Sequence, residues 1–139
     1  MIVKSVFLPL PLNAAFELFT QKIGQWWPAD RRHTQDPASE IFLLASGRFY
    51  ERARDGCEMD LGRVRAREFP ERILLDFYVA TGREQPTEVE IAFAATTGGT
   101  QLIVRHGPKP VSEALWSERA PRYERSWDVV LAALSRAAA

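Results

Sequence analysis

Three side chains in this sequence could carry acid–base chemistry: His106, Glu51 and Tyr123. His106 follows Leu102 and Val104 at two-residue spacing, so on a strand all three side chains point to the same, enclosed side. An inward imidazole could act as a general base, bond to a ligand or bind a metal ion. It could equally be a core residue whose hydrogen bonds are satisfied within the protein.

Glu51 has the same strand parity as Phe49, so its carboxylate is also expected to face inward. A buried carboxylate is costly unless it is paired, and Arg63 or Tyr123 could serve as the partner. One interpretation is an acid or base at the floor of a pocket, with its pKa raised by burial. The other is a structural Arg–Glu pair at the rim of the sheet.

Two pairs of aromatic residues could contact a ligand. Trp26 and Trp27 are adjacent on a short helix, which predicts one ring pointing inward and the other near the surface, at the mouth of a pocket. They could instead fasten the short helices to the sheet. Tyr123 and Trp127 are four residues apart and share one helix face. Their side chains could form the wall of a pocket, pack in the core, or do both.

The elements that must position these side chains follow from hydrophobic periodicity and turn residues. An amphipathic helix is expected over residues 12–20, with a short helical turn ending at Trp26-Trp27-Pro28 and a loop over 28–39. A long helix opens at Ala120-Pro121, after a short connection from Pro108 to Glu118. Strands are expected at residues 2–8, 40–45, 48–53, 59–69, 72–80, 87–95 and 101–106, with a hairpin turn at 97–100.

A run of strands with one apolar face needs a cover, and the C-terminal helix is the only long element available. The sequence therefore predicts a single α+β domain over residues 1–139, in which a curved antiparallel sheet of about six to seven strands wraps around that helix. The side chains expected to line the space between them are Trp26, Trp27, Phe49, Phe77, Phe93, Val104, His106, Tyr123, Trp127 and Leu131.

Composition argues against several classes of protein. Lys plus Arg and Asp plus Glu both number 18, so there is no basic excess for nucleic acid. No apolar run is long enough to insert into a membrane. The single cysteine, Cys57, cannot form an internal disulfide; with no export signal recognisable, this favours the cytoplasm.

No metal or cofactor site is expected. The acidic residues Asp30, Asp36 and Glu40 near His33 lack the spacing of metal ligands, and there is no glycine-rich phosphate loop.

Several short motifs follow one another in a recognisable order along the chain. They are Ala15-Phe16-Glu17-Leu18-Phe19-Thr20, Ile23-Gly24-Gln25-Trp26-Trp27-Pro28, Gly47-Arg48-Phe49-Tyr50-Glu51-Arg52, Asp55-Gly56, Gly62-Arg63-Val64, Pro70-Glu71-Arg72-Ile73, Thr87-Glu88-Val89, Gly99-Thr100-Gln101-Leu102, His106-Gly107, and Tyr123 with Trp127. Their order resembles the SRPBCC superfamily, which includes START domains, birch-pollen-allergen proteins and polyketide cyclases. Within it, the chain is most similar to bacterial proteins related to the activator of the heat-shock-protein-ninety ATPase. That resemblance implies the helix-grip fold, with two short helices after the first strand and a cavity between sheet and helix.

Three functions remain open at this point, because a fold does not fix an activity. The first is a protein that binds a small hydrophobic molecule. The second is an enzyme of the cyclase or dehydratase kind, with His106, Glu51 and Tyr123 as its acid–base set. The third is a co-chaperone or another interaction protein, and a homodimer is also compatible with the sequence.

Overall fold

The computed structural model describes residues 1–139 and is built on one seven-stranded antiparallel sheet with the strand order β1-β7-β6-β5-β4-β3-β2. Three α-helices and two 3₁₀ turns (Ala29–Arg31 and Pro110–Ser112) complete it. The helices are α1 (Leu12–Phe19), α2 (Ile23–Trp26) and α3 (Glu113–Ala138). The strands are β1 (Ile2–Leu8), β2 (Glu40–Leu43), β3 (Arg48–Arg52), β4 (Glu58–Glu68), β5 (Arg72–Phe77), β6 (Thr87–Thr96) and β7 (Gly99–Pro108).

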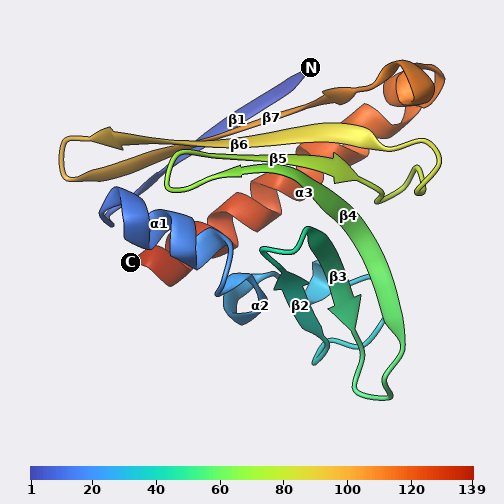
Figure 1. Cartoon of the computed structure of the whole chain (residues 1–139), viewed down its shortest axis with the longest axis horizontal. Coiled ribbons are helices and arrows are strands. Elements are labelled where there is room, and N and C mark those ends of the chain that lie inside the picture. Colours follow the sequence, from blue (N-terminus) through green and yellow to red (C-terminus); the bar gives the residue numbers. More distant parts are fainter.

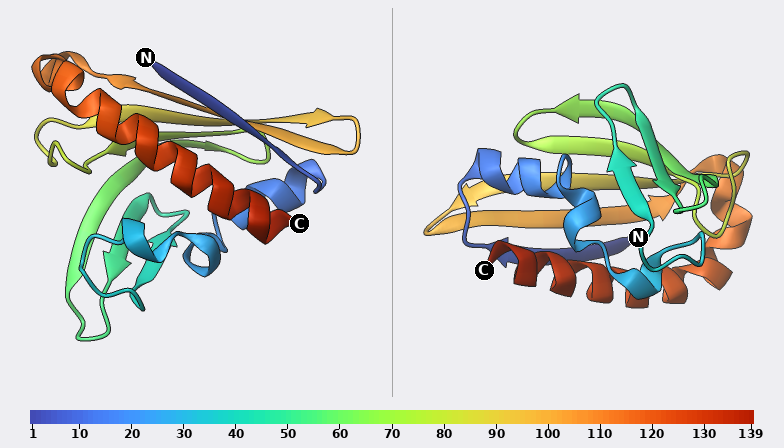
Figure 2. Two further views of the ribbon diagram at one scale, coloured as in Figure 1. Left: turned by 180° about the vertical axis from the view of Figure 1, so that it is seen from behind. Right: turned by 90° about the horizontal axis from the view of Figure 1, so that it is seen from below.

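The sheet is strongly curved, and α3 lies across one of its faces (Figure 1). Strand β4 bends away from the flatter part formed by β1, β7, β6 and β5, and it carries the short β2–β3 hairpin with it (Figure 1). Both short helices lie on the same side of the sheet as α3 (Figure 2). This arrangement confirms the expected α+β helix-grip architecture.

Alternating side chains explain why the central strands form. On β6, Val89, Ile91 and Phe93 are buried, whereas Glu90 and Ala92 between them are half-buried and Glu88 before them is exposed. The strand connects to β7 through Thr97 and Gly98, and Gly98 has φ 80°, a conformation that suits glycine. Register then aligns Val89 with His106 on β7, so the predicted inward direction of His106 is confirmed.

The beginning of α3 was predicted wrongly. The helix begins at Glu113, not at Ala120-Pro121, so the expected connection to Glu118 consists of a 3₁₀ turn and the first turns of α3. Pro121 lies inside the helix, where its missing N–H leaves the carbonyl of Ser117 without its usual helical donor. Trp116 extends the apolar face by packing on Tyr123, with ring centroids 5.8 Å apart, and so joins the first turns of α3 to the core.

Strand β5 is shorter than predicted, because it ends at Phe77 and not at residue 80. Ala80 has φ 67°, which no regular strand accommodates. The released carbonyls bind α3: the Tyr123 hydroxyl donates to the carbonyl oxygen of Val79, and Arg119 Nε donates to that of Ala80 at 2.9 Å. The loop after β5 is thereby fixed against the helix.

A single apolar core of buried side chains lies between the sheet and the three helices. The buried face of α3 consists of Tyr123, Trp127, Val130, Leu131, Ala133, Leu134 and Ala138, which includes every inward position expected from the helical spacing. None of the helices combines the length and apolar character that crossing a membrane requires. Cys57 is exposed and unpaired.

Candidate ligand-binding site

His106 lies at the centre of the space between β7 and α3, fully buried. The indole Nε1–H of Trp127 donates to its Nδ1 at 3.0 Å, and its Nε2 lies 2.7 Å from the Oγ1 of Thr87. An indole can only donate, so Nδ1 must be the unprotonated nitrogen, and Nε2–H donates to the threonine hydroxyl. Burial lowers the pKa of His106 to about 3, so the ring is neutral and both nitrogens are engaged.

Aromatic rings surround this histidine. The ring centroid of Tyr123 is 4.3 Å from that of His106, and those of Trp116 and Phe77 are at 5.2 Å and 5.4 Å. Burial raises the pKa of the Tyr123 phenol, whose hydroxyl is bonded to the Val79 carbonyl. Protein side chains therefore occupy most of the space in which a ligand was expected.

A small cavity remains beside the cluster. It has a volume of about 30 Å³, and its apolar wall consists of Trp27, Phe77, Val79, Tyr123, Trp127 and Val130. Pockets for drug-sized ligands have volumes of about 300–1,000 Å³, whereas one water needs roughly 10–15 Å³. The cavity as it stands holds one or two waters, so a ligand body could enter only if the aromatic side chains moved apart.

A larger hollow of about 380 Å³ opens next to this cavity, and we call it the vestibule. The two spaces share five lining residues, so the vestibule lies directly beside the cavity. The shared residues are Arg31, His33, Val79, Tyr123 and Ser126. The vestibule is also lined by Asp30, Arg32, Ala80, Arg122 and Arg125.

The residues predicted to contact a ligand divide into two groups. Trp27, Phe77, Tyr123 and Trp127 line the cavity. The others are buried in the core without reaching it, and their role in binding stays a prediction: Trp26, Phe49, Phe93, Val104, His106 and Leu131.

Trp26 and Trp27 do not separate into an inner and an outer ring, because each is only 7% exposed. Helix α2 ends at Trp26, and the chain turns to an extended conformation at Trp27 (φ −57°, ψ 128°), which directs the second ring inward as well. The Trp26 indole donates to the carbonyl of Leu18 at 2.7 Å, and that of Trp27 donates to the carbonyl of Arg31 at 3.2 Å.

Glu51 is buried as expected, but neither predicted partner, Arg63 or Tyr123, binds it. Its carboxylate accepts hydrogen bonds from the backbone N–H groups of His33 (2.7 Å) and Thr34 (2.8 Å) and from the hydroxyls of Thr34 and Ser39. Burial alone opposes ionisation, but these bonds outweigh it and hold the pKa of Glu51 below its ordinary value. Both interpretations of Glu51 were therefore wrong, since its pKa is not raised and no arginine pairs with it. Glu51 is an ionised anchor for the loop over residues 28–39.

The anchored loop contributes His33 to the vestibule. Burial lowers the pKa of His33, and the positive charges of Arg122 and Arg31 lower it further, whereas Glu51 acts in the opposite direction. His33 is consequently neutral at physiological pH and adds no charge of its own to the vestibule.

The vestibule arginines were missed by the sequence analysis. Arg122 and Arg125 lie beside the predicted apolar helix face of Tyr123 and Trp127, and Arg31 lies in the loop expected over residues 28–39. The available signal was that Arg122 and Arg125 are three residues apart, so on a helix they share one side, and that Arg122 is next to Tyr123 in the sequence.

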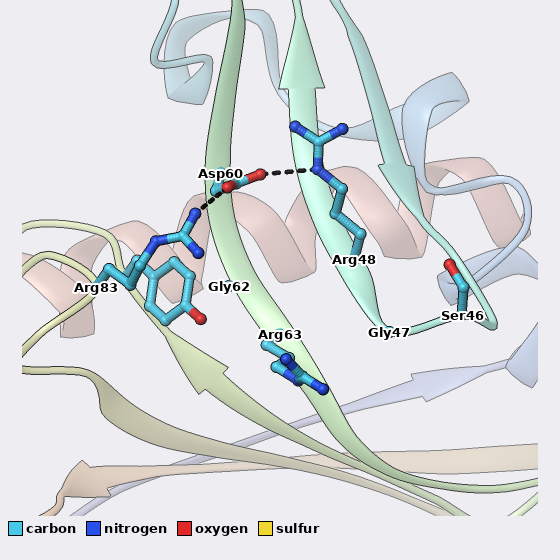
Figure 3. A pocket seen from close by; sticks show the side chains of 8 residues that line it. Ser46, Gly47, Arg48, Asp60, Gly62, Arg63 and Arg83 are labelled. Atoms are coloured by element: carbon cyan, nitrogen blue, oxygen red, sulfur yellow. Dashed lines mark hydrogen bonds and ion pairs between the residues drawn. The ribbon is translucent and has the colours of Figure 1, made fainter.

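A second hollow, of about 290 Å³, lies over strands β3 and β4 and the loop after β5 (Figure 3). Asp60 there binds both Arg48, at 2.9 Å, and Arg83, and Arg48 also binds Glu58. Figure 3 shows Arg63 on the same surface, which explains why it cannot reach Glu51. Because its charges are mostly paired internally, this hollow is the weaker candidate for a ligand site.

No group of three His, Cys, Asp or Glu side chains is close enough to hold a metal ion.

Comparisons with known proteins agree with this fold. The family model described as "Activator of Hsp90 ATPase homolog 1-like protein" matches residues 9–139. No curated protein matches the chain.

Several solved structures share the fold at low sequence identity. CalC of Micromonospora echinospora, a self-sacrificing resistance protein, is 20% identical with a TM-score of 0.72, covering 97% of this chain and 91% of that one. NE0264 of Nitrosomonas europaea is 14% identical with a TM-score of 0.64, covering 97% and 91%. DynU16, a protein of the dynemicin biosynthetic locus, is 16% identical with a TM-score of 0.61, covering 97% of this chain and 45% of that one.

Proposed function

The chain belongs to the Activator of Hsp90 ATPase homolog 1-like family, and from that premise we propose that it binds a small molecule with a hydrophobic body at the vestibule and the cavity behind it. The observation that carries the proposal is that the two spaces share a wall of five residues. A hollow of about 380 Å³ has the size of a small-molecule pocket, and it opens onto an apolar cavity walled by Trp27, Tyr123 and Trp127.

The ligand's hydrophobic body enters between α3 and the loop over residues 28–39. Aromatic rings offer large contact areas without polar groups that would need partners, and the indole N–H groups of Trp27 and Trp127 are already bonded within the protein. Since the cavity is almost filled, binding widens it through movement of side chains at its mouth.

An enzymatic role is less well supported by the geometry. His106 is neutral with both nitrogens engaged, and Glu51 is held by four donors, two of them from the backbone. These two residues and Tyr123 would form an acid–base set only if each gave up a bond that it makes here. A co-chaperone role rests on the description of the family alone. An unchanged ATPase rate of the chaperone on addition of this protein would count against it.

The test uses naphthalene-1-acetamide, a neutral aromatic probe, and follows the indole N–H signals of Trp27 and Trp127 by NMR. Ser126 is half-buried and lines both spaces, so Ser126→Trp fills the passage between them. Ser117→Trp is the matched control, because Ser117 lies on the same helix but is exposed and lines no pocket.

We expect the wild type and Ser117→Trp to bind the probe with saturable shifts of both indole signals. Ser126→Trp should bind at least tenfold more weakly. Equal binding by Ser126→Trp and the wild type would contradict the proposal, as would the absence of shifts in the wild type up to the solubility limit of the probe.

A further inference from the structure

The vestibule concentrates positive charge in a protein that has no net charge. Four of its lining residues are arginines (Arg31, Arg32, Arg122 and Arg125). The only carboxylate in the lining of the vestibule is that of Asp30. The remaining titratable groups in the lining, His33 and Tyr123, are neutral, because burial lowers the pKa of the first and raises that of the second. The chain as a whole carries 18 basic and 18 acidic side chains, so this excess is local.

Two of the four arginines are committed to the protein. The guanidinium of Arg32 donates to the backbone carbonyls of Gly24, Trp27 and Ser39, which fixes the loop. Arg31 Nη1 lies 3.4 Å from Asp30 Oδ2. These contacts engage both terminal nitrogens of Arg32, whose Nε has no partner, and neutralise part of the charge of Arg31.

Arg122 and Arg125 differ from both. Neither side chain forms an ion pair or a hydrogen bond, although most other arginines, such as Arg48, Arg72 and Arg105, are paired with carboxylates. Three residues apart on α3, the two guanidinium groups lie on the same side of the helix and border the vestibule together. The charge of Arg122 extends to His33 across the vestibule, since it lowers the pKa of that histidine.

One buried carboxylate lies behind this surface. Glu51 acts on both His33 and Arg32, but all of its hydrogen bonds come from the loop. It does not pair with Arg122 or Arg125. The potential facing the vestibule is therefore positive, and two guanidinium groups are free to donate.

We propose that the ligand of this site is an amphipathic anion, whose oxyanion group is bound by Arg122 and Arg125 while its hydrophobic body enters the cavity. The planar guanidinium matches the geometry of carboxylate and phosphate oxygens. The aromatic wall beneath excludes a purely polar anion from the deeper part. This inference rests on the proposed function and adds the chemical class of the ligand.

The experiment compares two probes of nearly equal shape, naphthalene-1-acetate and naphthalene-1-acetamide, by NMR titration of the intact protein. A charge-assisted hydrogen bond is stronger than a neutral one, which predicts about tenfold tighter binding of the acetate at low salt. The preference should shrink as ionic strength rises, because salt screens exposed charges.

The variant Arg122→Gln/Arg125→Gln should lose the preference and retain the affinity for the acetamide. Arg136→Gln is the matched control, because Arg136 is also exposed, also without an ion pair and also on α3, but lines no pocket. It should retain the preference in full. All of these positions are exposed, and melting temperatures would verify that the variants are folded.

The outcomes separate the two proposals. If neither probe binds the wild type, the proposed function is overturned. If both probes bind with equal affinity, the proposed function stands and the anionic ligand is refuted. If the preference for the acetate persists in the double variant, the assignment to Arg122 and Arg125 is wrong.

Discussion

The Glu51 carboxylate anchors the loop that forms one wall of the vestibule, so replacing it should destabilise the protein in a way that can be calculated. In Glu51→Gln the amide oxygen can still accept the three hydrogen bonds of Oε2, now without the full negative charge. The amide nitrogen in the place of Oε1 faces the backbone N–H of His33, so that bond is lost and the donor is left unpaired. A hydrogen bond to a charged group contributes about 1.5–3 kcal/mol, so we expect a loss of about 3 kcal/mol or more in the free energy of unfolding at pH 7.

Urea unfolding measures this loss directly. Glu88→Gln is the control, because Glu88 is exposed on β6 without an ion pair, and it should change stability by less than about 0.5 kcal/mol. Wild-type stability for Glu51→Gln at pH 7 would refute the assignment of Glu51 as the anchor.

The pH dependence gives a second test of the same residue. The pKa of Glu51 is lower in the folded protein than its ordinary value of 4.5, so the folded state favours the ionised form. The stabilisation is therefore complete above the ordinary pKa and is lost as the pH falls through the folded-state pKa. The difference between wild type and Glu51→Gln should shrink below about pH 4.5; a difference that stays constant from pH 7 to pH 3 would contradict the reasoning.

Two further predictions concern other parts of the fold. His106 should remain neutral in NMR titrations from pH 8 down to pH 4.5, because its folded-state pKa is about 3. Since the unfolded chain takes up this proton more readily, the free energy of unfolding should fall as the pH drops below the ordinary pKa of 6.5. A titration of His106 near pH 6.5 would contradict both expectations. Gly99→Ala should destabilise the protein by about 3 kcal/mol or more in urea unfolding, since a Cβ atom there would lie 2.2 Å from the carbonyl oxygen of Leu8. Gly56→Ala, where nothing lies within 4 Å of such an atom, should lose only about 1–2 kcal/mol from its positive φ, and equal losses would show that the contact with Leu8 is irrelevant.

Much of the fold could be predicted because its central strands obey a simple period. Val89, Ile91 and Phe93 alternate with outward residues, so their direction and that of the neighbouring β7 side chains followed from the sequence. The start of α3 did not follow, because Pro121 is typical of a helix start. The turns before Pro121 are held by packing of Trp116 on Tyr123 and His106, a tertiary contact that the local pattern does not reveal.

The site was less predictable, for two physical reasons. Glu51 is bound by residues 12 to 18 positions away in a loop without periodicity, and two of its donors are backbone N–H groups that no residue type reveals. The vestibule forms where that loop meets Arg122 and Arg125 on α3. The proximity of this loop to α3 depends on the curvature of the sheet, which the alternation of apolar and polar residues does not encode.

The register of β1 has a consequence for how the chain assembles. Ile2 pairs with His106, so the first strand has its only sheet neighbour at the far end of the strand sequence. During synthesis β1 has no strand to pair with until β7 has been made, and the apolar face of the sheet stays uncovered until α3 has been made as well. Contacts of such long sequence separation form slowly and leave apolar surface exposed in the meantime. Tyr123 and Trp127 belong to α3, so in a nascent chain the wall of the cavity is completed only when the last element closes over the sheet.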